Sequence, residues 1–115
     1  MKVDLFRSSS GRSPVEDFIS NLSKEDQALF KTIHDGIERE GLKYPYVIFK
    51  PLEGKLWEIK FKGLDGSYRI GYVLVTGPKM FWLHVFKKKT QKISRLDFEL
   101  AWKRMKEILE YEKNS

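Results

Sequence analysis

The spacing of hydrophobic positions predicts two helices early in the chain. Residues 13–22, SPVEDFISNL, place apolar side chains at the i, i+3, i+4 and i+7 positions that form one helix face. Ser13 is suited to the N-cap and Pro14 to the first helical position, and an acidic residue three positions after the cap completes a capping box. Ser23 begins a second helix in the same way, and Gly41 ends it. The apolar stripe of this second helix consists of Leu29, Phe30, Ile33 and Ile37.

Alternation of apolar and polar residues predicts the strands. Residues 2–6 form a short first strand, while 56–62 and 68–75 alternate over their whole length and are joined by a glycine-containing turn. Residues 80–86, MFWLHVF, are nearly all apolar, as expected for a central strand covered on both faces. The two prolines within 44–54 predict an irregular or extended segment there.

The pattern at the C-terminal end predicts a third long helix over residues 94–113, with Ser94 as its cap and Asp97 as the N3 partner of that cap. The element order is therefore βααβββα. We expect a single α+β domain over residues 1–115, with one mostly antiparallel four-stranded sheet and helices packed on one face. The other sheet face would carry part of the charge.

The amino-acid composition argues against several kinds of protein and of functional site. Hydrophobic residues make up 41% of the 115 residues, cysteine is absent, and there are two histidines. Disulfides and thiolate chemistry are thus excluded, and a classical zinc site is not expected. No apolar stretch is long enough for a transmembrane helix, and the N-terminus does not resemble a signal peptide. We expect a cytoplasmic protein that needs no cofactor, metal or membrane.

The distribution of charge says more than the net charge of +6. Residues 50–95 hold eleven lysines or arginines against three acids, a balance of +8, whereas the rest of the chain holds eleven bases and thirteen acids. A focused basic surface attracts polyanions, most often nucleic acid. It could equally bind an acidic protein partner.

Candidate chemistry lies on the polar faces of the two alternating strands. Glu58, Lys60 and Lys62 form one row, and Arg69 on the facing strand is expected to point to the same side. An exposed lysine near a turn, such as Lys62, needs no functional explanation. Lys60 and Arg69 are flanked by large apolar residues, and for them function and mere exposure are equally good interpretations.

The basic run FKKKTQKIS, residues 86–94, follows the most hydrophobic strand. A lysine cluster is more often a solvated loop than a site. Antiparallel pairing, however, would bring Lys87, Lys88 and Lys89 next to Arg69. Cations that converge on one concave surface could stabilise the extra charge of a phosphorane-like transition state and bind the phosphate chain.

Other catalytic patterns do not occur. The chain has no glycine-rich phosphate loop and no HExxH motif, and with two histidines no Ser-His-Asp set is recognisable. The basic segment has three acids, too few for a metal-dependent nuclease. His84 and Trp82 could stack on RNA bases. On so apolar a strand, Trp82 and Phe86 are nevertheless expected to belong to the core.

These segments together resemble the RelE/HigB-like toxins of bacterial type II toxin–antitoxin systems, in the phage-derived subgroup. The matching pieces, in family order, are GRSPVEDFISNL, PLEGKLWEIKF, SYRIGYV, LHVFKKKTQKIS and LAWKRM. The resemblance implies a RelE-like fold and a ribonuclease that cleaves mRNA, typically in the ribosomal A site. It also implies a cognate helix-turn-helix (HigA-like) antitoxin, through which alone operator DNA would be bound.

The family motifs fall on particular positions of this chain. The strand motif covers Trp57 to Lys60, with lysine where many relatives have arginine, and the arginine that contacts the scissile phosphate corresponds to Arg69. The LHxFxKKTxK motif falls on Leu83, His84, Phe86, Lys88, Lys89, Thr90 and Lys92. Ser94 stands where the family often has proline. Phe98 is the nearest aromatic residue to a tyrosine that some relatives use, which argues against a tyrosine acid or base.

We therefore expect a metal-independent endoribonuclease in which the ribose 2′-OH attacks the adjacent phosphate, giving a cyclic phosphate and a 5′-OH. Arg69 and Lys89, assisted by Lys88, would stabilise the transition state, and Lys60 or Glu58 would accept the proton. The residues expected to bind RNA are Lys55, Lys62, His84, Lys87 and Lys92. The alternative is a non-catalytic basic module that binds RNA or an acidic protein.

Overall fold

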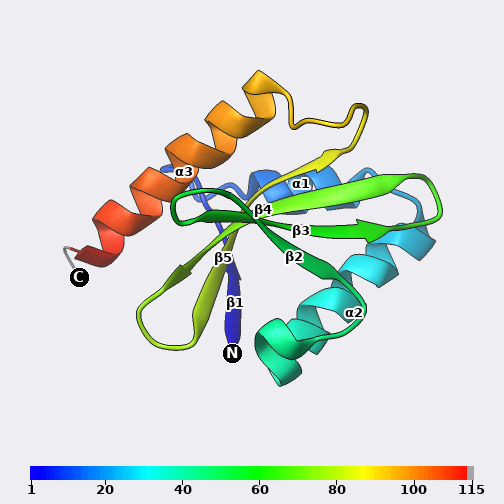
Figure 1. Cartoon of the computed structure of the whole chain (residues 1–115), viewed down its shortest axis with the longest axis horizontal. Coiled ribbons are helices and arrows are strands. Elements are labelled where there is room, and N and C mark those ends of the chain that lie inside the picture. The colour runs from blue at the N-terminus through cyan, green and yellow to red at the C-terminus, as the bar shows by residue number, and fades with distance from the viewer. Residues whose placement is uncertain (114–115) are drawn as a thin grey trace.

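The computed structural model describes residues 1–113, whose strands and helices are shown in Figure 1. The helices are α1 (Pro14–Ser20), α2 (Lys24–Glu40) and α3 (Arg95–Lys113), with one 3-10 turn, η1 (Gly41–Lys43). The strands are β1 (Lys2–Leu5), β2 (Ile48–Glu53), β3 (Leu56–Lys62), β4 (Ser67–Val75) and β5 (Lys79–Lys87). Among the described residues, no helix is both long and apolar enough to cross a membrane.

The strands form one sheet in the order β1-β5-β4-β3-β2. β1 pairs with β5 in parallel, and the other three pairings are antiparallel. The predicted α+β class and the mostly antiparallel sheet are thus confirmed. β5 lies between β1 and β4, and its residues pack on both sides, as its apolar sequence predicted.

The predicted strand count was wrong, because the segment expected to be irregular contains β2. Pro51 pairs with Trp57, and the register shifts between Pro51 and Glu53. Proline cannot donate a ladder hydrogen bond, but an edge strand with a bulge does not need every donor. β2 is such an edge strand, so the prolines did not prevent a fifth strand from forming.

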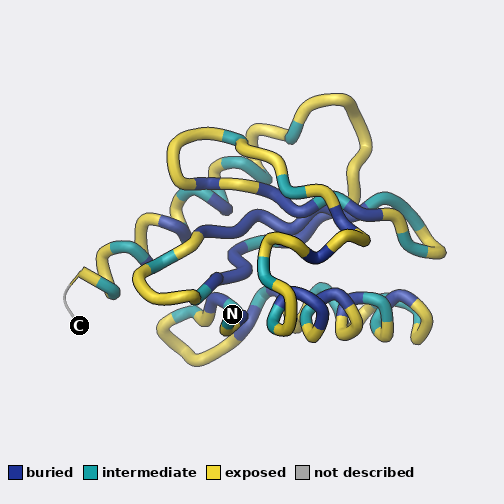
Figure 2. Tube along the Cα trace, turned by 60° about the horizontal axis from the view of Figure 1, so that its bottom comes forward, coloured by how far each residue is buried: buried dark blue, intermediate teal, exposed yellow. Residues whose placement is uncertain are grey.

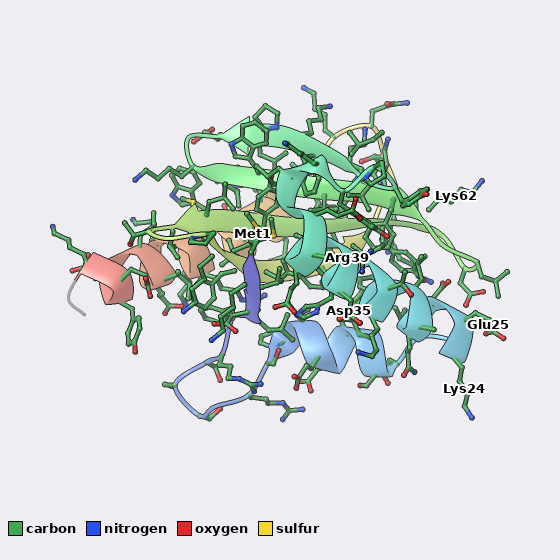
Figure 3. The ribbon with its side chains drawn as sticks, turned by 90° about the horizontal axis from the view of Figure 1, so that it is seen from below. Met1, Lys24, Glu25, Asp35, Arg39 and Lys62 are labelled. Carbon is green, nitrogen blue, oxygen red and sulfur yellow. The ribbon has the colours of Figure 1, made fainter. Side chains whose placement is uncertain are left out.

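The prediction that the helices pack on one face was also wrong. Phe30, Ile33 and Ile37 of α2 pack in one core cluster, whose members from the sheet include Ile59, Tyr68, Ile70 and Tyr72. Residues of α3 pack in a second cluster; its helix members are Ala101, Met105 and Ile108, and its sheet members are Leu56, Val73, Phe81 and Leu83. Figure 1 shows the sheet between α3 and the pair α1–α2. Figure 3 shows α2 along its side of the sheet, from Lys24 and Glu25 to Arg39.

Serine side chains fix where all three helices begin, as predicted. The Ser13 hydroxyl accepts a hydrogen bond from the Glu16 amide at 3.1 Å, and the Ser23 hydroxyl accepts one from the Asp26 amide at 3.2 Å. Ser94 accepts from the Asp97 amide at 3.0 Å. Each bond satisfies one of the amides that the first turn of a helix leaves without a partner.

α3 covers only part of its sheet face. It approaches the sheet closely at Gly71, where an added Cβ would lie 3.2 Å from the Ala101 side chain. Beyond this point the β5–α3 connection leaves the sheet as an exposed segment, while the central strands remain buried (Figure 2). The uncovered part of the face is where the predicted polar row lies.

Candidate functional site

The strand register brings the predicted charged residues together. Lys60 of β3 lies directly opposite Arg69 of β4, which in turn lies opposite Phe86 of β5. Glu58 lies opposite Gly71, two residues along the same strand pair. Residues paired in this way share a sheet face. The expectation that Glu58, Lys60 and Arg69 point to one side is therefore confirmed.

These residues line a cleft of about 740 Å³ between the sheet and the β5–α3 connection. Its wall includes Phe18 and Lys50 as well as the predicted residues. The cationic residues of the wall are Lys50, Lys60, Arg69, Lys87, Lys88, Lys89 and Lys92, and its acidic residues are Glu58 and Asp97. The cleft is strongly positive, and its wall draws on strands β2 to β5, the β5–α3 connection, α1 and the first turn of α3.

The cations of the cleft have no ion-pair partners in the described part of the chain, although Lys87 lies near enough to Asp26 to lower the pKa of that carboxyl. Within residues 1–113, none of the seven forms an ion pair, whereas Lys79 and Arg95, outside the cleft, pair with Asp4 and Glu99 at 3.3 and 2.9 Å. Arg69 is 7% exposed, and its guanidinium donates to the Tyr68 carbonyl at 2.9 Å. Unpaired cations around a concave surface attract anions and increase their local concentration.

Glu58 is the second buried charge of the cleft. The residue is 7% exposed, and within residues 1–113 its carboxylate makes no hydrogen bond or ion pair, so its oxygens are not sealed in the protein but open to the cleft. Buried carboxylates usually accept hydrogen bonds from the protein. Glu58 therefore has free acceptor capacity next to Arg69 and Lys60.

The connection that carries three of the lysines is anchored at both ends. Its first residue, Lys88, donates its amide to the Ser67 carbonyl at 2.8 Å. At the other end the Ser94 hydroxyl donates to one oxygen of Asp97 at 2.7 Å, and His84 lies 2.7 Å from the other oxygen. Arg104 lies 3.1 Å from the second ring nitrogen of His84.

His84 is held in its neutral form. Burial lowers its pKa, more strongly than the hydrogen bond to Asp97 raises it, and Arg104 lowers the pKa further. Both ring nitrogens have partners, and the ring stacks on Phe86 with centroids 5.7 Å apart. His84 is therefore not free to stack on a base or bind a phosphate, contrary to the predicted RNA-binding role.

The structure assembles most of the predicted site residues but not all. Glu58, Lys60, Arg69 and the lysines at 87, 88, 89 and 92 share the cleft. Lys55 lies in the β2–β3 turn, just before β3 begins, and does not line the cleft. Lys62 is exposed near the β3–β4 turn, also outside the cleft (Figure 3).

Lys50 and Phe18 were not predicted. Lys50 lies opposite Glu58 on β2, the strand that the prolines concealed. Recognising alternation in Ile48–Glu53 would have placed Lys50 on the charged face. Phe18 comes from α1 and has no signal in the sequence beyond its place in an apolar stripe, since its position at the cleft depends on tertiary packing.

The β3–β4 turn next to the cleft is fixed by a different carboxylate. Asp26 of α2 is 1% exposed and accepts hydrogen bonds from the amides of Leu64 and Asp65, at 2.7 and 3.0 Å, and from the Tyr68 hydroxyl. Burial raises the pKa of Asp26, but these three donors outweigh it, so the pKa is lowered overall. A side chain at Gly63 would clash with this carboxylate.

One group of side chains among residues 1–113 has the composition of a metal site. His34, Asp35 and Glu38 present ligand atoms within 4.8 Å of one another on α2. His34 and Glu38 already bond the carbonyl and amide of Val3, which attaches β1 to α2. α2 covers the sheet face opposite the one that α3 covers, so this group is not part of the cleft.

Comparison with known protein families gives one match. The model of the family described as "Phage derived protein Gp49-like (DUF891)" matches residues 17–106, which is more than half of the chain and includes every residue of the cleft wall. No curated protein matches the chain.

Proposed function

The chain belongs to the Gp49-like family of phage-derived proteins, and from this premise we propose that it is the toxin of a type II toxin–antitoxin system that cleaves mRNA. The family is associated with RelE/HigB-like toxin–antitoxin systems, which supports the toxin assignment. The endoribonuclease activity rests on the cleft. The main support for this activity is that Arg69 and Glu58 are both buried, have no ion-pair partners within residues 1–113, and are surrounded by six lysines.

This arrangement supplies what transesterification of RNA requires. The ribose 2′ oxygen attacks the adjacent phosphorus, the bond from phosphorus to the 5′ oxygen breaks, and a 2′,3′-cyclic phosphate and a 5′-OH result. Negative charge builds up on the phosphate oxygens in the transition state, where fixed cations in a partly dry site are most effective. Arg69 is buried and held by the Tyr68 carbonyl, and Lys89, assisted by Lys88, lies on the other wall.

The proton of the 2′-OH passes to Glu58 or Lys60. Glu58 can accept it directly, because its carboxylate has no donor within the described residues. Lys60, directly opposite Arg69, can accept it only in its neutral form. A proton donor to the leaving 5′ oxygen is available from the lysines of the cleft wall.

The proposed partners follow from the same surface. Single-stranded mRNA on the translating ribosome would occupy the cleft, with Lys87 and Lys92 binding flanking phosphates. A cognate helix-turn-helix antitoxin would neutralise the protein and alone would contact operator DNA. The second candidate, a basic module that binds RNA or an acidic protein without cutting, is favoured by the same unpaired lysines.

The test is induction of the chain in a bacterium that lacks an antitoxin, with Arg69→Ala as the matched variant. We expect the wild type to arrest growth and cleave mRNA, and the variant to lose about 100- to 1000-fold in cleavage rate while still folding. Cleavage by Arg69→Ala at the wild-type rate would overturn the assignment. RNA binding without cleavage by the wild type would favour the binding module.

A further inference from the structure

His84 occupies a place that the proposed chemistry leaves unexplained. It is the polar residue in the interior of β5, between apolar neighbours, and only 13% of its side chain is exposed. Its ring reaches from the sheet to α3 at two points, Asp97 in the first turn and Arg104 two turns later. The cleft lies directly beyond Asp97, which is also part of the cleft wall.

The contacts fix which nitrogen of His84 carries the proton. Arg104 donates from Nη1 to the Leu83 carbonyl at 3.0 Å and lies 3.1 Å from Nδ1 of His84. A guanidinium can only donate, so Nδ1 must be the unprotonated nitrogen. Nε2 then carries the hydrogen and donates to Asp97 Oδ1 at 2.7 Å. The ring is a neutral link between a cation and a carboxylate, with Arg104 and Asp97 as the charged groups that face it.

The cationic connection depends on this link at one end. Within the described chain, residues 89–93 make a single hydrogen bond, from the Thr90 hydroxyl to the Lys92 carbonyl. The connection is therefore positioned by its ends, Lys88 on the Ser67 carbonyl and Ser94 on Asp97. Asp97 holds Ser94 with one oxygen and His84 with the other. At the C-terminal end of the connection, the hydrogen bonds of Ser94 and Asp97 reach the sheet through His84.

We propose that His84 is a positioning residue, whose neutral ring ties Asp97 and the end of the 88–94 connection to the sheet and so holds Lys88 and Lys89 across the cleft from Arg69. This inference rests on the proposed function for its catalytic consequence. The anchoring itself is a property of the fold and can be measured without cleavage. A misplacement of catalytic cations by about 1 Å can cost about 100-fold in rate, so the anchor would act on kcat.

Two substitutions of His84 separate the loss of its hydrogen bond to Asp97 from the loss of the imidazole ring itself. His84→Gln keeps an amide N–H at the reach of Nε2 and can still donate to Asp97, whereas His84→Asn is one methylene shorter and cannot. Arg104 can still donate to the Leu83 carbonyl in both variants. A matched control is His34→Asn, which changes the other histidine of the chain on the opposite side of the sheet.

Two measurements on the purified full chain carry the test. Hydrogen exchange reports the order of residues 88–94, and steady-state cleavage of mRNA on ribosomes separates kcat from KM, with thermal unfolding as the check on folding. We expect His84→Asn to speed exchange in 88–94 and lower kcat about 10- to 100-fold with little change in KM. His84→Gln should restore most of both, and His34→Asn should change neither.

Unchanged exchange and kcat in His84→Asn would overturn the proposal. Equal losses of exchange protection and kcat in the Asn and Gln variants, together with a lower unfolding temperature, would overturn it as well. Such a result would mean that His84 has only a structural role. If the wild type cleaves no RNA, the proposed function fails. Faster exchange in His84→Asn but not in His84→Gln would still support the anchor in that case.

Discussion

Two buried carboxylates of this protein lie in opposite chemical settings. Asp26, in the turn region where α2 meets the β3–β4 hairpin, accepts hydrogen bonds from two amides and a tyrosine hydroxyl. Glu58, in the cleft on the other sheet face, makes no hydrogen bond or ion pair within residues 1–113. Asp26 belongs to α2 and Glu58 to β3, and both residues are more than nine-tenths buried.

The hydrogen bonds of a buried carboxylate indicate whether it has a structural or a functional role. A carboxylate whose acceptor capacity is filled by the protein stabilises the fold, because removing it leaves its donors without partners. A carboxylate that the fold leaves without donors, with oxygens open to a cleft, contributes little to stability and is available to a ligand. By this criterion the Asp26 region is structural and the Glu58 region is the site, although Glu58 is part of the β3–β4 hairpin and Asp26 binds the turn of that hairpin.

The largest effect is expected at Asp26. Asp26→Ala leaves the Leu64 and Asp65 amides and the Tyr68 hydroxyl without their acceptor, so the free energy of unfolding should fall by about 3–5 kcal/mol. Urea denaturation measures it. Asp35→Ala, on the exposed side of the same helix, is the control and should leave the midpoint nearly unchanged. A similar midpoint for both variants would contradict the structural role of Asp26.

Glu58 should show the converse behaviour. Glu58→Gln removes the charge but keeps the shape, and because no donor depends on it, the free energy of unfolding should change by less than about 1 kcal/mol. Cleavage of mRNA should fall about 100-fold if Glu58 accepts the proton. Unchanged cleavage together with wild-type stability would leave Lys60 as the acceptor, and a large loss of stability would contradict the comparison itself.

A smaller effect separates lysines inside the cleft from lysines outside it. Lys89→Ala removes one of several cations near the phosphate and should slow cleavage about tenfold. Lys55→Ala, in the β2–β3 turn at the other end of β3, is the matched control and should cleave at the wild-type rate. Equal rates for the two variants would mean that the cleft does not define the site.

The smallest expected effect is a pH dependence of stability from His84. Burial lowers the pKa of its ring, so between the folded pKa and the ordinary value of about 6.5 the unfolded chain binds the proton and the folded chain does not. The stability that depends on neutral His84 is complete above that value and falls as pH decreases. Urea denaturation at pH 7.5 and 5.5 should show this decline in the wild type and much less of it in His84→Gln. An equal decline in both would rule out His84 as its source.

The sequence was sufficient for the helices and for the charged face. Caps such as Ser23 and strict alternation in β3 are local signals, and they predicted element types and the shared side of Glu58, Lys60 and Arg69 correctly. β2 was missed because the rule against proline holds for inner strands and not for an edge. The placement of α3 on the second face, the hydrogen bonds of His84 and the contribution of Phe18 depend on packing between distant segments, which no local pattern specifies.

The central claim is that the cationic cleft cuts RNA. Mapping of RNA 5′ ends after incubation of the purified chain with mRNA, with and without ribosomes, tests it most directly. The account predicts new internal ends that carry a 5′-OH, with a cyclic phosphate on the matching upstream fragment, and their disappearance in Arg69→Ala. Intact mRNA in the presence of the wild-type protein and translating ribosomes would contradict it.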